Sequence, residues 1–160
     1  MRSLFLGNIL DGLIKKSNLN NKTLLEYILN SKIFETNSKK ILISGFQHYF
    51  NGDYISCLHV LTPQLEKAMR HILAILKVPT TCMGTDGITE KTLGSILREE
   101  KLLNLLGGDI STYFSTILID KRGDNLRNDI SHGLINEDAC IKNIATCLLH
   151  LFLLMTRFKI

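Results

Sequence analysis

Three side chains near the C-terminal end of this chain combine a permanent positive charge, a polar amide and a titratable ring. They are Arg127, Asn128 and His132, in a segment that reads RNDISHG. Arginine stays charged at any working pH, and its planar guanidinium matches a phosphate group. Histidine can both take and give a proton near neutral pH. These groups together predict a site that cleaves RNA without a metal ion. Asp129 and Ser131 lie between them and are supporting candidates.

A short helix would position these groups. If Asp124 or Asn125 caps this helix, Arg127 and Asn128 lie in its first turn, where free backbone amides favour an anion. Arg127 and His132 are about 140° apart around a straight helix and do not share a face, whereas Asn128 and His132 do. The long arginine stem can still swing toward the imidazole.

The same segment also has a purely structural interpretation. Arg127 and Asp129 can be solvated surface charges. His132 can be a cation at a helix C-terminus beside Gly133, where the helix dipole and a glycine turn both favour it. Spacing alone leaves this alternative open.

Hydrophobic periodicity over the rest of the chain predicts an all-α bundle. Apolar residues recur at helical spacing. The predicted helices cover about 22–34, 39–50, 54–77, 89–97, 102–106 and 110–119, followed by the motif helix and one last helix. Residues 80–87 are polar and contain glycine, which predicts an exposed loop.

Polar residues at the starts of these runs predict where several helices begin. Asp53, Thr89 and Asp109 each precede an apolar run and are placed as N-caps. Asn136 is predicted to cap the last helix, with two acidic residues favoured in its first turn by the helix dipole. Pro63 lies inside the longest helix, which predicts a kink or a break there.

The longest predicted helix carries a second polar group. Glu66 and Arg70 are four residues apart, and with His59 they form a polar stripe opposite the apolar seam. In a bundle this stripe can face the motif, so Glu66 and Arg70 are candidates to orient Arg127 or His132. The alternative is an exposed ion pair worth about 0.3–0.5 kcal/mol.

Length and composition predict one globular domain. The chain has 160 residues, of which 45% are hydrophobic and 21% charged. Residues 1–38 are predicted to form an N-terminal helical extension and residues 39–160 the core bundle. The net charge of +4 permits an anionic partner. Because no dense basic stripe accompanies it, any anion site must be local.

Residue usage excludes several classes of site. The cysteines show no spacing suited to zinc and no cofactor motif occurs, so we expect no cofactor and no metal. Unpaired cysteines predict a reducing compartment, hence the cytoplasm. His48 and His150 lie on apolar helices and are predicted to be satisfied within the bundle. The most hydrophobic stretch, 144–155, is too short to span a bilayer, so no membrane partner is expected.

The Arg-x4-His spacing before the last long helix resembles the HEPN superfamily (higher eukaryotes and prokaryotes nucleotide-binding). More narrowly, the sequence LRNDISHGL at 126–134 is similar to the signature of a family of short uncharacterised domains in bacteria and eukaryotes, marked by Arg-Asn-x-x-x-His-Gly. Segments 61–70 and 92–97 also fit this family. The similarity therefore runs from about residue 40 to the C-terminus.

This resemblance implies a four- or five-helix up-and-down bundle that pairs into a homodimer. The two motifs would line a shared cleft and act as a metal-independent endoribonuclease on single-stranded RNA. His132 would act as base on the 2′-hydroxyl or as acid on the 5′-oxygen, Arg127 would stabilise the phosphorane, and Asn128 would orient one of them or bind phosphate. The products would be a 2′,3′-cyclic phosphate and a 5′-hydroxyl.

The resemblance also implies a biological setting and an alternative. HEPN ribonucleases act as toxins, in defence or in RNA turnover, with an antitoxin or regulatory protein as a further partner. In toxins silenced by a nucleotidyltransferase a tyrosine follows the histidine by two positions; Leu134 stands there in this chain, which argues against that regulation. The alternative is a catalytically inert HEPN-like module that binds a nucleotide, RNA or a protein. A helical docking domain of a longer protein is a third interpretation.

Overall fold

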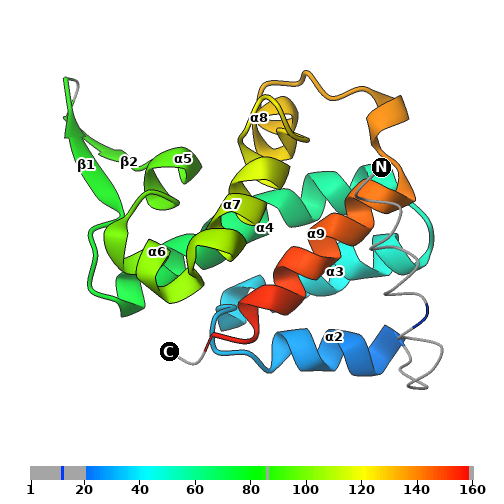
Figure 1. The fold of residues 1–160 in the computed structure, drawn as a ribbon. Helices are drawn as coiled ribbons and strands as arrows, with labels where there is room; N and C mark the ends of the chain where they lie inside the picture. Colours follow the sequence, from blue (N-terminus) through cyan, green and yellow to red (C-terminus); the bar gives the residue numbers. More distant parts are fainter. Residues whose placement is uncertain (1–11, 13–20, 86, 159–160) are drawn as a thin grey trace.

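A computed structural model of the chain describes residues 12, 21–85 and 87–158, which form a mostly helical bundle with one small sheet (Figure 1). The α-helices, in chain order, are α2 (Asn21–Leu29), α3 (Lys39–Phe50), α4 (Tyr54–Ile75), α5 (Leu93–Ile96), α6 (Glu100–Leu106), α7 (Gly108–Leu118), α8 (Leu126–Ser131) and α9 (Lys142–Met155). The predicted helical fold class is confirmed. Most of the predicted N-terminal extension, residues 1–20 except residue 12, lies outside the described residues.

α4 is the central helix of the bundle and contacts α3, α5, α6, α8 and α9. The side chains of its apolar seam are fully or almost fully buried: Leu58, Leu61, Leu65, Met69 and Ile72. Gly45 lets α3 approach closely, because a Cβ there would collide with the Leu61 side chain. Asp53 caps α4 as predicted, accepting a hydrogen bond from the Ser56 backbone N–H at 3.0 Å. Pro63 does not break the helix.

α9 closes the core on the side opposite the hairpin (Figure 1). Its Phe152 ring lies 5.4 Å from the Phe34 ring and 5.2 Å from the Phe46 ring, between centroids. The Tyr49 hydroxyl shares a buried hydrogen bond of 3.0 Å with the Thr146 hydroxyl. Residues from α2 to α9 thus contribute to a single hydrophobic core. No described helix has the length and apolar character needed to cross a membrane.

An antiparallel hairpin replaces the loop predicted at 80–87 and the first two residues of the helix predicted at 89–97. Strand β1 (Thr81–Gly84) pairs with β2 (Gly87–Glu90), with Met83 opposite Ile88. Gly84 and Gly87, which pair at the tip of the hairpin between runs that contain β-branched residues, are the hairpin signal that the loop prediction missed. The hairpin projects from the body of the molecule (Figure 1). Its Met83 and Ile88 side chains are exposed.

The start of α5 is corrected accordingly. The predicted cap Thr89 belongs to β2, and α5 begins at Leu93. Thr92 is its cap, since its hydroxyl accepts a hydrogen bond from the Ser95 backbone N–H at 3.2 Å. A threonine in extended backbone before a short apolar run performs the predicted role three residues later than expected.

Three other boundaries differ from the predictions. α2 ends at Leu29 rather than near 34, because the chain turns there and directs Ile33 and Phe34 into the core. Asp109 lies inside α7, whose N-cap is Gly107 with a φ of 77°. Asn136 does not cap the last helix: it precedes the short 3-10 turn η2 (Glu137–Ala139), and α9 begins at Lys142. A second such turn, η1 (Thr36–Ser38), precedes α3.

Candidate functional site

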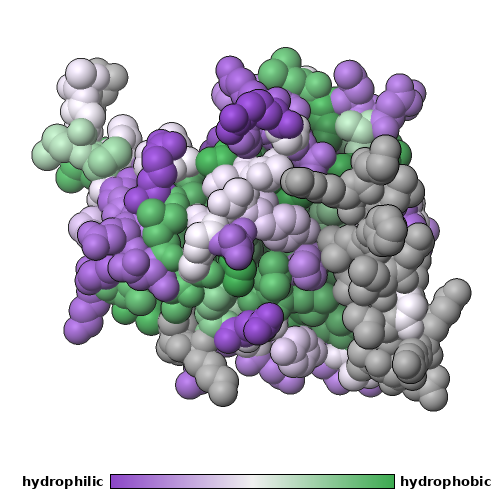
Figure 2. All heavy atoms as spheres, in the orientation of Figure 1, coloured by the Kyte–Doolittle hydropathy of each residue, from purple (hydrophilic) through white to green (hydrophobic). Residues whose placement is uncertain are grey.

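Most of the RNDISHG segment lies in α8, which packs against α4 and α7 (Figure 1). A close turn leads into it: the Asp124 backbone N–H donates to the Thr116 carbonyl at 3.0 Å, and a Cβ at Gly123 would collide with the same carbonyl. Only glycine therefore permits this approach of α8 to α7. In Figure 2 polar residues gather around α8 in this view.

Asn125 is the N-cap residue of α8, but its side chain does not cap the helix in the predicted way. Its backbone is left-handed, with a φ of 47°. Its Nδ2 donates to Asp129 Oδ1 at 2.8 Å, and its Oδ1 accepts from Asn128 Nδ2 at 2.8 Å. The polar residues of the first turn hold one another instead of leaving free side-chain groups at the helix N-terminus.

Arg127 projects from α8 onto α4, where Glu66 holds it. Its Nε donates to Glu66 Oε2 at 2.8 Å, and its NH2 nitrogen is 3.5 Å from Glu66 Oε1. The Glu66 and Arg127 side chains are 14% and 24% exposed, so this ion pair is largely removed from water. The NH1 nitrogen makes only a long contact, 3.4 Å, with Asn128 Oδ1. One edge of the guanidinium is thus fixed, while donors on its other nitrogens have no short partner among the described residues.

Glu66 binds a second arginine on its own helix. Arg70 NH2 donates to Glu66 Oε1 at 2.7 Å, and Arg70 NH1 donates to Glu90 Oε2 at 2.8 Å. The same guanidinium also donates to the backbone carbonyl of Lys91, directly after the hairpin. Glu66 and Arg70 therefore do not form the exposed ion pair of the alternative interpretation: they link α4, α8 and the base of the hairpin.

Asn128 lies on the α7 side of α8. Its amide donates to Asn125 Oδ1 and, at 3.4 Å, to the Ile119 carbonyl at the end of α7. Asp129 accepts from Asn125, and its backbone carbonyl accepts from the Leu134 N–H at 2.7 Å. These contacts anchor the helix to its neighbours and close the turn after it.

His132 is the C-cap residue directly after α8, and its side chain is exposed. Its ring makes no hydrogen bond or ion pair with any residue that the structure describes. Ser131, also exposed, ends the helix beside it. Gly133 follows with a φ of 66°, a left-handed conformation that reverses the chain after the helix. The imidazole is therefore free to meet a ligand.

Within one chain the two principal candidates face different ways. Arg127 is held toward α4 by Glu66, while His132 lies exposed at the helix end without contacting Arg127. The predicted swing of the arginine stem toward the imidazole is absent, because Glu66 offers the guanidinium a charged partner closer to its own face of α8.

A cavity of about 180 Å³ adjoins the other side of the motif. Its lining is mixed: Asp124, Leu126, Asp129, Leu134, Ile135, Asn136, Ala139 and Ile144. Desolvation beside it raises the pKa of Asp124 above the ordinary value for an aspartate. The lining includes Leu134, two residues after His132, but neither Arg127 nor Glu66.

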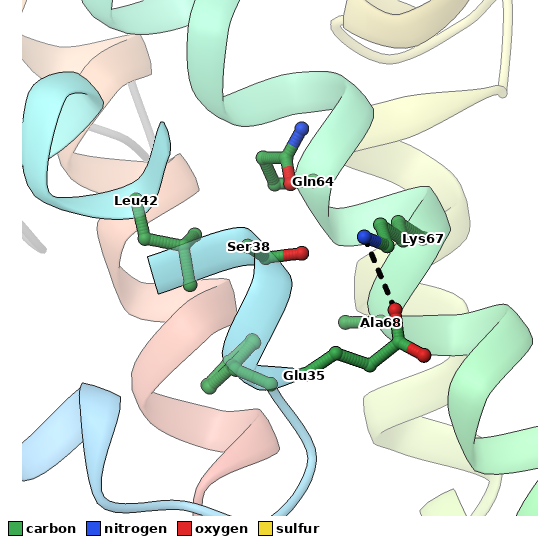
Figure 3. Close-up of a pocket in the computed structure, with 7 residues that line it drawn as sticks. Glu35, Ser38, Leu42, Gln64, Lys67 and Ala68 are labelled. Atoms are coloured by element: carbon green, nitrogen blue, oxygen red, sulfur yellow. Dashed lines mark ion pairs between the residues drawn. The ribbon is translucent and has the colours of Figure 1, made fainter. Parts of the chain in front are cut away.

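Two further cavities lie near α3 and α4, far in sequence from the motif. One holds about 10 Å³, room for roughly one water molecule. Figure 3 shows Glu35 and Lys67 directed toward one another at its edge, in an ion pair of 3.1 Å. The other, an open groove of about 490 Å³, is lined by residues that include Lys32, Lys39 and His71. Neither contains a residue predicted for the site.

The histidines predicted to be satisfied within the bundle do have partners. His48 Nδ1 lies 2.9 Å from Asp53 Oδ2, and His150 Nδ1 lies 3.2 Å from the Tyr113 hydroxyl. His59, part of the predicted polar stripe, is exposed and contacts the Ile55 carbonyl of its own helix. It does not reach the motif.

Sequence reasoning missed Glu90 as part of this site. It lies 20 residues from Arg70 in sequence and only the hairpin brings them together. The available signal was the glycine pair at 84 and 87, which would have placed Glu90 in a strand. Lys91 was missed for the same reason, and its Nζ pairs with Glu99 Oε1 at 2.7 Å.

Among the residues that the structure describes, no three histidine, cysteine, aspartate or glutamate side chains are grouped so that they could hold a metal ion. Comparison with models of known protein families, with curated proteins and with solved structures finds no significant match to this chain.

Proposed function

We propose that this protein is a metal-independent endoribonuclease of HEPN type that cleaves single-stranded RNA to 2′,3′-cyclic phosphate and 5′-hydroxyl ends. The observation that carries the proposal is the setting of Arg127. Glu66 holds its Nε at 2.8 Å, while 24% of the side chain stays exposed and donors remain for an anion. A preorganised guanidinium with spare donors stabilises negative charge that develops in a transition state.

The chemistry needs one proton removed and one supplied. His132 takes the proton of the 2′-hydroxyl, and the 2′-oxygen attacks phosphorus. Arg127 stabilises the added charge on the phosphorane oxygens. The bond from phosphorus to the 5′-oxygen then breaks, and that oxygen takes a proton from water.

Pairing of two protomers would also bring together the Arg127 and His132 side chains, which face different ways within one chain. Arg127 and His132 are about 140° apart around α8, so one chain does not direct both at a single phosphate. A two-fold dimer lets Arg127 of one protomer and His132 of its partner face the same phosphodiester. The exposed His132 ring at the helix end is accessible to such an arrangement.

The test uses a labelled single-stranded RNA incubated with the protein in EDTA, with product ends identified. We expect cyclic phosphate ends, and rates that fall by about 10²–10⁴-fold in His132→Ala. Arg127→Ala should be comparably impaired. The His132→Ala protein should melt like wild type, because the ring makes no described contact.

His59→Ala is the matched control, since it removes another exposed histidine whose ring contacts only its own helix. It should cleave like wild type. Undiminished cleavage by His132→Ala would end the catalytic assignment, as would 3′-hydroxyl product ends.

One observation favours a second candidate, an inert HEPN-like module that binds RNA or a nucleotide. Arg127 is already paired with Glu66, so its charge can serve the fold alone. The same assay separates the two. RNA that is bound but not cut in wild type, with binding lost in Arg127→Ala, supports the binding module.

A further inference from the structure

Two guanidinium groups share one carboxylate where α4 meets α8. Glu66 Oε1 accepts from Arg70 at 2.7 Å and lies 3.5 Å from the Arg127 NH2, while Oε2 accepts from the Arg127 Nε at 2.8 Å. Two positive charges against one negative charge leave one positive charge in excess. Because these side chains are only 14% to 24% exposed, solvent and salt screen that charge less than they screen surface charges.

Glu90 neutralises this excess from the hairpin. Its Oε2 accepts from Arg70 NH1 at 2.8 Å. Glu90 is the last residue of β2, opposite Thr81, and its side chain is 62% exposed, against 23% for Arg70. An ion pair with one partner this exposed contributes little to stability. An anion of higher charge can therefore take the place of the Glu90 carboxylate.

Arg70 stays in position when Glu90 moves away. Its NH2 nitrogen is held by Glu66 Oε1 and by the Lys91 carbonyl, and neither contact involves Glu90. The NH1 nitrogen, which now donates to Glu90 at 2.8 Å, would then keep only a long contact of 3.5 Å with the Thr80 carbonyl, with its geometry already set. A fixed guanidinium of this kind binds phosphate oxygens through charge-assisted hydrogen bonds.

We propose that Arg70 forms a second phosphate subsite beside Arg127, and that Glu90 occupies this subsite until an RNA phosphate displaces it. The inference rests on the proposed function for its RNA substrate and extends it. Arg127 binds the scissile phosphate, and Arg70 binds a neighbouring phosphate of the same strand. Since both guanidiniums contact one carboxylate, they lie side by side, as adjacent phosphates of a strand require.

The test measures binding rather than cleavage. The probes are inorganic pyrophosphate and a short RNA carrying a 2′-O-methyl group on every nucleotide, which blocks the attacking hydroxyl. Titration calorimetry and fluorescence anisotropy give Kd for each. We expect Glu90→Gln to bind both probes roughly 3- to 10-fold more tightly than wild type. This gain should be absent when Arg70→Gln is added, because the cation that Glu90 masks is then gone.

Glu99→Gln is the matched control. It makes the same change of charge nearby, but Glu99 pairs with Lys91 at 2.7 Å and has no contact with Arg70. Its Kd values should change less than 2-fold, roughly the size of a general charge effect on a screened surface. If Arg70→Gln fails to fold, Arg70→Lys replaces it. The comparison of Glu90→Gln with Glu99→Gln tests the subsite even if neither Arg70 variant can be used.

The outcomes separate this inference from the proposed function. Equal effects of Glu90→Gln and Glu99→Gln, or no effect of Glu90→Gln, overturn the subsite even if wild type cuts RNA through His132. Tighter pyrophosphate binding by Glu90→Gln but not by Glu99→Gln supports the subsite even if wild type cuts no RNA. The absence of RNA cleavage would reject the ribonuclease proposal only.

Discussion

At the scale of single residues, the nitrogens of the Arg127 guanidinium divide between a bond to the fold and donors left for a ligand. Its Nε is committed to Glu66, which fixes the direction of the guanidinium. Its remaining nitrogens make only long contacts, to Glu66 and to Asn128. This division requires a planar group with several donors, and lysine, a point charge on a flexible stem, does not provide it.

Arg127→Lys should therefore lose most cleavage while keeping the fold. The charge remains, but a single ammonium cannot bind Glu66 and a phosphate in fixed geometry at once. We expect kcat to fall by about 10²-fold or more, as for loss of an oriented transition-state donor. The thermal midpoint should change little, since Arg70 still pairs with Glu66. Single-turnover cleavage and a calorimetric melt measure the two effects.

Arg122→Lys is the control for this substitution. Arg122 lies just before α8 and is 91% exposed, paired with Asp120. It should cleave at the wild-type rate. Wild-type cleavage by Arg127→Lys would mean that charge alone suffices there, against the role given to the guanidinium.

At the scale of elements, the packing of α7 against α9 includes a polar contact within an apolar interface. His150 on α9 meets the hydroxyl of Tyr113 on α7, and Cys147 lies near the same hydroxyl. Burial lowers the pKa of His150 and raises the pKa values of Tyr113 and Cys147. All three groups are thus neutral near pH 7, and none offers a charge to balance a protonated imidazole.

This contact predicts a loss of stability in mild acid. The pKa of His150 is lower in the folded state than in the unfolded state, so below about pH 6.5 the unfolded chain binds more protons and stability falls as pH falls. His150→Gln keeps a polar side chain but cannot titrate. We expect its free energy of unfolding, from urea titrations between about pH 7 and 5, to fall less steeply than that of wild type.

His59→Gln serves as the comparison, because that histidine is exposed on α4. Its stability should follow the wild-type pH dependence. If the stabilities of His150→Gln and wild type fall in parallel with pH, protonation of His150 does not cause the loss of stability in mild acid.

At the scale of the whole molecule, α4 joins the core to the candidate site. Its apolar seam packs into the bundle, while Glu66 and Arg70 on the same helix hold α8 and the hairpin. In one chain the exposed His132 imidazole lies at the end of α8, apart from the Arg127 guanidinium. A complete site by the proposed mechanism therefore needs two copies.

Mixing two inactive variants tests this requirement. In a two-fold dimer that pairs Arg127 of one chain with His132 of the other, a heterodimer of Arg127→Ala and His132→Ala contains one intact site. Equal mixing should restore roughly a quarter of the wild-type rate, because about half of the dimers are mixed and each has one of two sites. No recovery, with mixed dimers verified by tagged pull-down, would show that each chain acts with its own two residues.

The sequence alone determined the helical character of the chain and its local polar groups. Periodicity located the centres of α3, α4 and α9, and Asp53 capped α4 as expected, because such signals lie within a few residues of one another. The i,i+4 spacing of Glu66 and Arg70 was visible in the same way. A hairpin signal was present too, but β1 and the start of β2 were predicted to be an exposed loop, and the end of β2 was assigned to the following helix.

Only the tertiary structure decided which partners these groups meet. Glu66 and Arg127 are separated by 61 residues, and the packing of α8 on α4 brings them to 2.8 Å. The hairpin likewise delivers Glu90 to Arg70. Spacing along a helix sets the face on which a side chain lies, but the free energy of a half-buried charge depends on what packs against that face. For this reason Arg127 turned toward α4 and not toward His132.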